Sequence, residues 1–288
     1  MLAKRIMLMY FSNKTYVVGN LFNIVIVVVL FVAFLGDQTA NNMEFLLGFA
    51  VEGIESIVIG MVFGGLIAMI SVGTCLGALQ IIVEDWECAA KDFHISPVSR
   101  TKISRGYLLG TMAIGIFITL ASIVVCLTVM MLFGGSFPSM VSIGRLLLTA
   151  VLCVVCSTTL IYLVIVCVKT PNTFHAFSGG LSVFIGFLMG VYVPIAALPE
   201  PIQWFMRLFP LTHAAAMFRQ SLADEQLSIL FADAPPDALE TFRTVFGVAF
   251  DYGGFISDFW FSAAMLAGGS VLFYVLSVIV VRRKTTHM

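Results

Sequence analysis

Long runs of apolar residues recur along this chain, and most of them are long enough to cross a lipid bilayer. About 20 apolar residues cross the roughly 30 Å of hydrocarbon. The expected spans are residues 17–35, 57–83, 107–133, 146–168, a run that begins near Phe174 and breaks at Pro194, and residues 259–281. Only 11% of the 288 residues are charged, whereas soluble domains average about 25%. The sequence therefore predicts an all-α, polytopic membrane protein with six transmembrane helices, folded as a single domain over residues 1–288.

Several kinds of chemistry are excluded by what the sequence lacks. No Gly-Lys pair occurs, so the chain has no P-loop for nucleotide. The net charge of −1 gives no reason to expect a nucleic-acid partner. Cys153 and Cys156 form a lone pair inside an apolar run, which we interpret as packing. The four histidines have no metal-ligand spacing: His94, His175, His213 and His287.

Basic residues are distributed unequally between the two sides that six spans would define. Eleven fall on one side: Lys4, Arg5, Lys14, Lys91, Arg100, Lys102, Arg105, Lys169, Arg282, Arg283 and Lys284. Four fall on the other: Arg145, Arg207, Arg219 and Arg243. Cytoplasmic loops carry the excess of Lys and Arg. We therefore predict cytoplasmic termini and a cytoplasmic segment 84–105. Residues 194–258 are predicted outside, as a Pro-rich hairpin followed by a polar, solvated loop at residues 219–258.

The N-terminal residues 1–16 alternate basic and apolar side chains. Lys4, Arg5 and Lys14 stand among residues such as Leu2 and Ile6. This pattern is typical of an amphipathic helix that lies on anionic membrane lipids. We expect an interfacial helix here.

Residues 84–105 form the most charged segment, with eight charged residues of 22. Its apolar residues Trp86, Ala89, Ala90 and Phe93 recur at helical spacing, which predicts a short amphipathic helix. Pro97 would end that helix, and Ser96 would cap the next one with Pro97 at its first position. This segment is either a docking surface or a solvated loop between two spans.

Small residues and prolines mark two further features. The second span contains Gly60-x-x-x-Gly64 and Gly73-x-x-x-Gly77, and the fifth contains Gly186-x-x-x-Gly190. Such spacing lets helices approach closely. After the fifth span, a short apolar piece at residues 202–209 lies between prolines and is too short to cross. It predicts a re-entrant hairpin, whose backbone must be satisfied by protein or water.

Two stretches resemble the membrane subunit of type-2 ATP-binding-cassette (ABC) exporters. Residues 91–100, KDFHISPVSR, are similar to the family segment F-x-x-[ST]-P-x-x-R between the second and third spans. Residues 190–213 resemble the pattern G-x-[FY]-x-P, L-P, Q, then N-P-x-T-H after the fifth span. Phe209 replaces the asparagine that many members have there. Span count, spacing and topology extend the resemblance over the whole chain.

The resemblance implies a bacterial plasma-membrane permease that works with a separate ABC-type ATPase and with a second copy of itself or a paralogous permease. ATP and Mg²⁺ would bind the ATPase, so this chain would need no cofactor and be no enzyme. The resemblance implies an ATPase-coupling helix that includes Glu84, Asp85, Trp86, Lys91, Asp92, Phe93, Ser96, Pro97 and Arg100. It implies an exit-capping hairpin that includes Tyr192, Pro194, Pro199, Gln203, Pro210 and His213. Substrate would move along the second and fifth spans.

Two other function classes stay open at this point. An ion-coupled secondary transporter would need no ATPase, but such proteins usually keep ionisable residues in mid-membrane, and the expected spans carry almost none. A membrane-embedded transferase would need a cluster of acid, histidine or nucleophile facing water, which the sequence does not offer. For the substrate, the sequence indicates only an apolar path, which suits a hydrophobic or amphipathic molecule.

The asymmetry of basic residues generates a test of orientation. A cysteine introduced at Asp237 is expected to react with an impermeant maleimide added to intact cells, because residue 237 is predicted outside. A cysteine introduced at Lys102 is expected to react only after the cells are opened. The reverse labelling pattern would overturn the predicted orientation.

Overall fold

The computed structural model describes residues 2–14, 17–19, 22, 24–25, 29, 54–95, 100–132, 137–168, 170–193, 195–232 and 236–286. These residues form helices and turns, and the only extended pairing among them is an isolated bridge between Asp251 and Ile256. The chain is all-α over this part, as predicted. Most of the first expected span, residues 17–35, lies outside the described residues.

The helices follow one another in a simple order along the chain. Their bounds are α1 Leu2–Ser12, α4 Ile54–Ile95, α5 Arg100–Leu132, α6 Met140–Cys167, α7 Pro171–Leu188, the 3₁₀ turn η2 Ile195–Ala197, α8 Glu200–Leu208, α9 Pro210–Leu230, α10 Pro236–Val245 and α11 Phe259–Thr286. Among them, four carry stretches long and apolar enough to cross a membrane: Ile57–Glu84, Ile103–Leu132, Met140–Cys167 and Phe259–Arg283. These match the second, third, fourth and sixth predicted spans.

The predicted fifth span falls on α7, which has 18 residues and is not among these four apolar helices. Asn172, Thr173 and His175 in its first turns lower its hydropathy. Thr170 caps its N-terminus by accepting a hydrogen bond from the Thr173 amide at 3.3 Å. This helix is about 27 Å long at 1.5 Å per residue, close to the hydrocarbon thickness.

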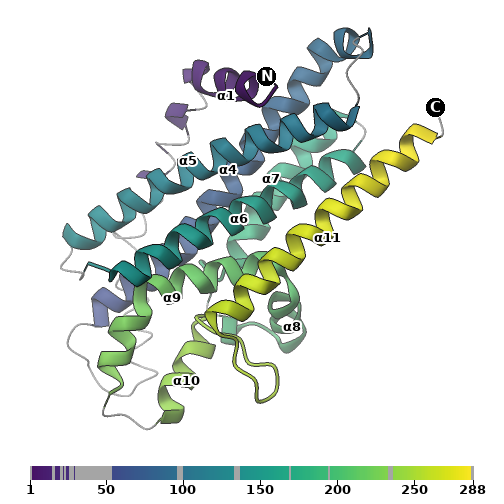
Figure 1. Cartoon of the computed structure of the whole chain (residues 1–288). Helices are drawn as coiled ribbons and strands as arrows, with labels where there is room; N and C mark the ends of the chain where they lie inside the picture. Colours follow the sequence, from purple (N-terminus) through teal and green to yellow (C-terminus); the bar gives the residue numbers. More distant parts are fainter. Residues whose placement is uncertain are drawn as a thin grey trace.

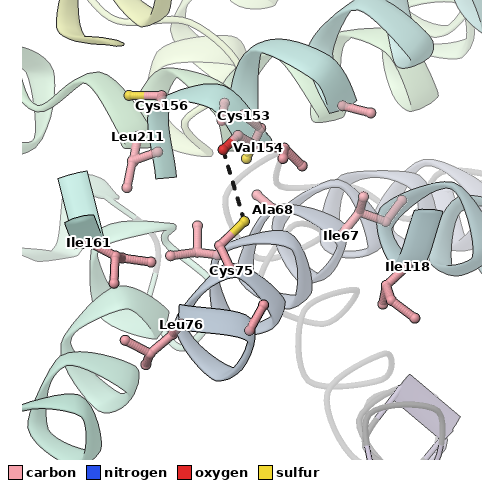
Figure 2. Packing of buried hydrophobic residues seen from close by; sticks show 14 of the residues in the cluster. Ile67, Ala68, Cys75, Leu76, Ile118, Cys153, Val154, Cys156, Ile161 and Leu211 are labelled. Atoms are coloured by element: carbon pink, nitrogen blue, oxygen red, sulfur yellow. Dashed lines mark hydrogen bonds between the residues drawn. The ribbon is translucent and has the colours of Figure 1, made fainter. Parts of the chain in front are cut away.

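Helix α4 is the centre of the bundle, packed against α5, α6 and α9 (Figure 1). Within its apolar stretch 72% is buried inside the chain, against 22% for α11 at the periphery. Figure 2 shows Cys75 of α4 pointing at α6, with its sulfur 3.9 Å from the Val154 carbonyl oxygen. Cys153 and Cys156 on α6 are fully buried in the same core. The cysteine pair therefore lies in close packing between helices.

The charged segment after the second span differs from the short separate helix expected there. Helix α4 continues without a break from Ile54 to Ile95. Its charged residues therefore extend an existing helix, because nothing in residues 84–95 interrupts helical hydrogen bonding before the Ser96-Pro97 step. Ser96 and Pro97, with their predicted capping role, lie outside the described residues.

The loop expected at residues 219–258 also differs from the prediction in its first part. Helix α9 packs against α4, α6 and α11, and all of residues 211–223 are buried. Polar residues in this stretch suggested a solvated loop, but they face backbone carbonyls inside the bundle. The polar external segment can therefore begin only beyond residue 223.

The two ends of the bundle carry different elements. Figure 1 shows the N-terminal end of α1 and the C-terminal end of α11 at the same end as the end of α4 and the start of α5, which we call the α4–α5 end. Helices α8 and α10 and the loop at residues 250–257 lie at the other, the α8–α10 end. Helix α1 packs on α5 through buried Ile6 and Tyr10, while Lys4 and Arg5 are exposed.

The first glycine pair of α4 lies where this helix meets α9. A Cβ atom on Gly64 would be 2.7 Å from the Arg219 amide nitrogen, and one on Gly60 would be 3.2 Å from the Leu222 carbonyl oxygen. The close helix approach that the spacing predicts is present here. A Cβ on Gly73 or Gly77 would meet no described atom within 4 Å, so the second pair makes no such contact within the described residues.

These two glycine pairs predict opposite effects of the same substitution. Gly64→Ala is expected to destabilise the protein by about 1–3 kcal/mol, because the added methyl group would overlap the backbone of α9 and force the two helices apart. Gly73→Ala is expected to be neutral or stabilising by up to about 1 kcal/mol, since alanine favours helix. Thermal unfolding in detergent, followed by size-exclusion chromatography, measures both. Equal midpoints for the two variants would contradict the close contact.

Candidate functional site

The sequence-predicted coupling residues lie at the α4–α5 end. Glu84 ends the apolar stretch of α4, and its Oε1 atom is 3.5 Å from Gln80 Nε2 and 3.9 Å from His175 Nε2 on α7. These contacts join the end of the apolar stretch of α4 to the N-terminal part of α7. Beyond them, α4 carries five of the predicted residues on its backbone, and Arg100 begins α5. The five are Asp85, Trp86, Lys91, Asp92 and Phe93.

The helical backbone of residues 84–95 decides which positions share a face. Positions 86, 89, 90 and 93 fall on one side of an α-helix because residues three and four apart are neighbours. All are inside α4. The apolar stripe expected from the sequence is therefore a continuous feature of this extension of α4.

At the α8–α10 end, α7 finishes in a Schellman motif. The Gly190 amide donates to the Phe187 carbonyl at 2.9 Å, and the Val191 amide donates to the Gly186 carbonyl at 3.2 Å. Gly190 has φ +60°, in the left-handed region that glycine adopts without strain. It thus lies just after the helix. Among the described residues, the ring of Tyr192 covers Gly186 and would overlap a Cβ added there. The Gly186/Gly190 pair is therefore a helix ending, unlike the predicted helix contact.

Helix α10 finishes in the same motif. The Gly247 amide donates to the Thr244 carbonyl at 3.4 Å, and the Val248 amide donates to the Arg243 carbonyl at 2.8 Å. Gly247 has φ +66°. Two helices far apart in sequence therefore end with a left-handed glycine at the same end of the bundle.

Arg219 of α9 joins these two helix endings to α4. Its Nη2 donates to the Met189 and Gly190 carbonyls at 2.6 and 2.9 Å, and its Nη1 donates to the Gly247 carbonyl at 3.2 Å. Its Nε donates to the Met61 carbonyl of α4 at 3.1 Å. The side chain is 3% exposed. We call Arg219 and these four carbonyl groups the Arg219 cluster.

The charge of Arg219 is balanced by helix ends. No carboxylate among the described residues pairs with it. The C-terminus of a helix carries about half a negative charge on its last carbonyl groups, and both α7 and α10 end at this guanidinium. The cluster therefore places a cation between two partial negative charges inside the protein.

His213 links three elements near the start of α11. Its Nε2 is 2.9 Å from the Arg207 carbonyl, which can only accept, so this nitrogen carries the proton. Its Nδ1 then accepts from the Ser262 hydroxyl of α11 at 3.1 Å. The Tyr252 hydroxyl also donates to the Arg207 carbonyl, at 2.5 Å. Burial lowers the pKa of His213 to about 4, so the ring is neutral near pH 7. His213 is thus a neutral, buried connector between α8, α9 and α11.

Three of the other predicted hairpin residues lie just before α8, on α8 and at the start of α9. Gln203 Nε2 donates to the Leu198 carbonyl at 2.8 Å, which ties α8 to the residue that follows η2. Pro199 precedes α8, and Pro210 begins α9 against Gly269 of α11, where a Cβ would be 2.5 Å from Pro210 Cγ. Pro194 lies outside the described residues. The structure therefore brings Gln203, Pro210 and His213 into one region.

The comparison with known protein families gives one match. Residues 50–279 match the profile of the ABC-2 family transporter proteins. That is well over half of the chain, and it includes both the α4 extension and the α8–α10 end. The chain belongs to this family. No curated protein matched the sequence.

Membership in the ABC-2 family makes this chain a membrane subunit of the ABC transporter class. Such a subunit is a transport component that is generally not catalytic itself, and it normally works with an ABC ATPase. The several apolar helices agree with a multi-pass membrane protein. The resemblance of residues 91–100 and 190–213 is thus confirmed at the level of the family.

The sequence patterns do not identify Arg219 or Gly247 as site residues. Both fall in a stretch expected to be a solvated loop. One signal was available: His213, Arg219 and Gln220 stand in an Ala-rich helix that starts at a proline. Small residues beside a few polar ones are typical of close helix packing with internal hydrogen bonds.

The His213 connector in this ABC-2 subunit can be tested by a double-mutant cycle. His213→Phe and Tyr252→Phe are expected to be non-additive by about 0.5–3 kcal/mol, because both side chains share the Arg207 carbonyl. Equilibrium unfolding in mixed detergent micelles measures the three variants. The matched control pairs His213→Phe with Tyr192→Phe, whose ring lies over Gly186, and should be additive. Additive effects at Tyr252 would contradict the shared contact.

Proposed function

We propose that this chain is the transmembrane subunit of an ATP-driven exporter that moves a hydrophobic or amphipathic substrate across a bacterial plasma membrane. A separate ABC-type ATPase binds ATP and Mg²⁺ and supplies the energy. The permease acts with a second copy of itself or a paralogous permease. Both termini and the α4–α5 end are cytoplasmic, and the α8–α10 end faces outward.

The observation that carries this proposal is the length of α4. Its apolar stretch ends at Glu84 but the helix continues to Ile95. Eleven further residues add about 16 Å, or three turns, beyond the stretch that can lie in hydrocarbon. An extension of this length, followed closely by α5, suits a partner protein that grips the end of α4.

The mechanism follows from the rigidity of that helix. ATP binding closes the ATPase dimer, and the ATPase then moves the α4 extension that it holds. Since α4 packs against α5, α6 and α9, its displacement shifts the bundle as rigid bodies between inward- and outward-open states. Only a partner that binds these two states with different affinity can drive this shift.

The substrate class is supported by the exposed face of α7. Phe177, Phe184 and Phe187 are each more than 40% exposed on this helix, and so is Val183. Helix α7 also contacts α4. These two helices correspond to the second and fifth predicted spans, so an apolar molecule can move along a surface of aromatic side chains there. Lipid can contact the same surface.

The ATPase contact is tested first at Phe93. An interface anchor that is truncated to alanine typically costs more than about 2 kcal/mol, or about thirtyfold in affinity. Phe93→Ala is therefore expected to leave the protein inserted in the membrane but to weaken co-purification of the ATPase and uncouple ATP hydrolysis from transport. Lys91→Ala is the matched control, and we expect little change because exposed charge pairs contribute little.

Three outcomes would contradict the proposal in different ways. Equal co-purification of the ATPase with wild type and Phe93→Ala would remove Phe93 from the docking surface. Transport that persists in vesicles without ATP would favour an ion-coupled transporter. Catalytic turnover by the purified chain alone would favour a membrane-embedded transferase.

A further inference from the structure

The α4 helix connects the proposed ATPase contact directly to the Arg219 cluster. Met61, whose carbonyl accepts from Arg219 Nε, lies in the second turn of α4. The coupling residues 84–95 lie at the opposite end of the same 42-residue helix. At 1.5 Å per residue the whole helix is about 63 Å long. The proposed ATPase contact and the contact with Arg219 therefore lie on one continuous helix.

The contact between α4 and α9 leaves no room for sliding at this point. A Cβ on Gly64 would be 2.7 Å from the Arg219 amide nitrogen, and one on Gly65 would be 2.9 Å from Arg219 Nη2. The guanidinium and the backbone of α9 thus lie directly against the backbone of α4. A displacement by one turn would remove the Met61 carbonyl from Arg219 Nε.

The same guanidinium holds the elements that cover the α8–α10 end. Its Nη atoms bond the turn after α7 at Met189 and Gly190, and the turn after α10 at Gly247. The turn after α7 leads into η2, which contacts α10. Because the guanidinium is planar, its donors keep fixed directions, and the carbonyl groups move with it as a unit.

We propose that Arg219 is a positioning residue that makes α4, α9 and the ends of α7 and α10 move as one body, so that movement of the ATPase-facing end of α4 reaches the α8–α10 end. This inference rests on the proposed function for the ATP-driven movement of α4. It adds the residue that transmits the movement and the segments that receive it.

Hydrogen exchange measured by mass spectrometry tests the transmission in the complex of this chain with its ATPase, reconstituted in nanodiscs. Exchange is compared between the nucleotide-free state and the state trapped with ATP and vanadate. In wild type, we expect a nucleotide-dependent change both at residues 84–95 and at residues 186–193 and 243–249. In Arg219→Gln, the change at residues 84–95 is retained and the change at the other two segments is lost.

Variants separate this role from a merely structural one. Arg219→Lys keeps the charge and some donors, so it should restore part of the response. Arg207→Gln is the matched control, because Arg207 lies at the same end but stacks on Trp204 outside the cluster, and it should respond like wild type. A structural role alone would raise exchange at residues 186–193 and 243–249 in both states and leave the nucleotide-dependent difference unchanged, which would overturn the proposal.

A disulfide between α4 and α9 tests the same inference even if the Arg219 variants fail to fold. A Cβ on Gly60 would be 3.5 Å from Ala223 Cβ, within the range for disulfides. Gly60→Cys with Ala223→Cys, in a Cys167→Ser background, should therefore form the bond. ATP hydrolysis by the complex is expected to be the same before and after reduction with dithiothreitol. Hydrolysis that is blocked until reduction would show that α4 and α9 separate, and would overturn the proposal.

Different results would contradict the proposed docking of the ATPase and the proposed role of Arg219. If nucleotide changes nothing at residues 84–95 of wild type, the proposed docking of the ATPase is wrong. If residues 84–95 respond in wild type while residues 186–193 and 243–249 do not, the docking stands and the role of Arg219 is wrong.

Discussion

One buried guanidinium organises the α8–α10 end of this protein. Arg219 bonds four backbone carbonyl groups that belong to α4 and to the turns after α7 and α10. Each buried polar group left without a partner costs about 1–3 kcal/mol. Loss of this side chain would therefore destabilise all three elements. Its charge needs no carboxylate because two helix C-termini point at it. Packing of α9 into the bundle depends on this arrangement.

Glycines make that arrangement possible at three places. Gly64 lets the backbones of α4 and α9 approach until only a hydrogen atom fits between them. Gly190 and Gly247 adopt left-handed conformations that turn the chain at the ends of α7 and α10. Each turn aims a carbonyl oxygen at the guanidinium. The positive charge and the three glycines therefore form a single structural unit, although they come from four separate segments of the chain.

Of the helices that the structure describes, α4 best suits the proposed transmission of movement across the membrane. Helix α4 is buried along its apolar stretch by α5, α6 and α9, so its movement cannot be local. Its extension beyond Glu84 projects at the α4–α5 end, and its second turn meets the Arg219 cluster. The helices at the periphery, such as α11, expose apolar side chains suited to lipid or to another subunit.

The sequence by itself determined the membrane class, four of the spans and the family, because apolar runs and short motifs are local properties that need no knowledge of contacts. It also indicated the helical stripe at positions 86–93. Only the tertiary structure decided the place of α9, since Arg219 and His213 are polar in sequence and become compatible with burial only when distant carbonyl groups meet them. The same holds for Gly60 and Gly73: identical spacing predicts close contact for both pairs, but a partner helix lies against the first pair alone within the described residues.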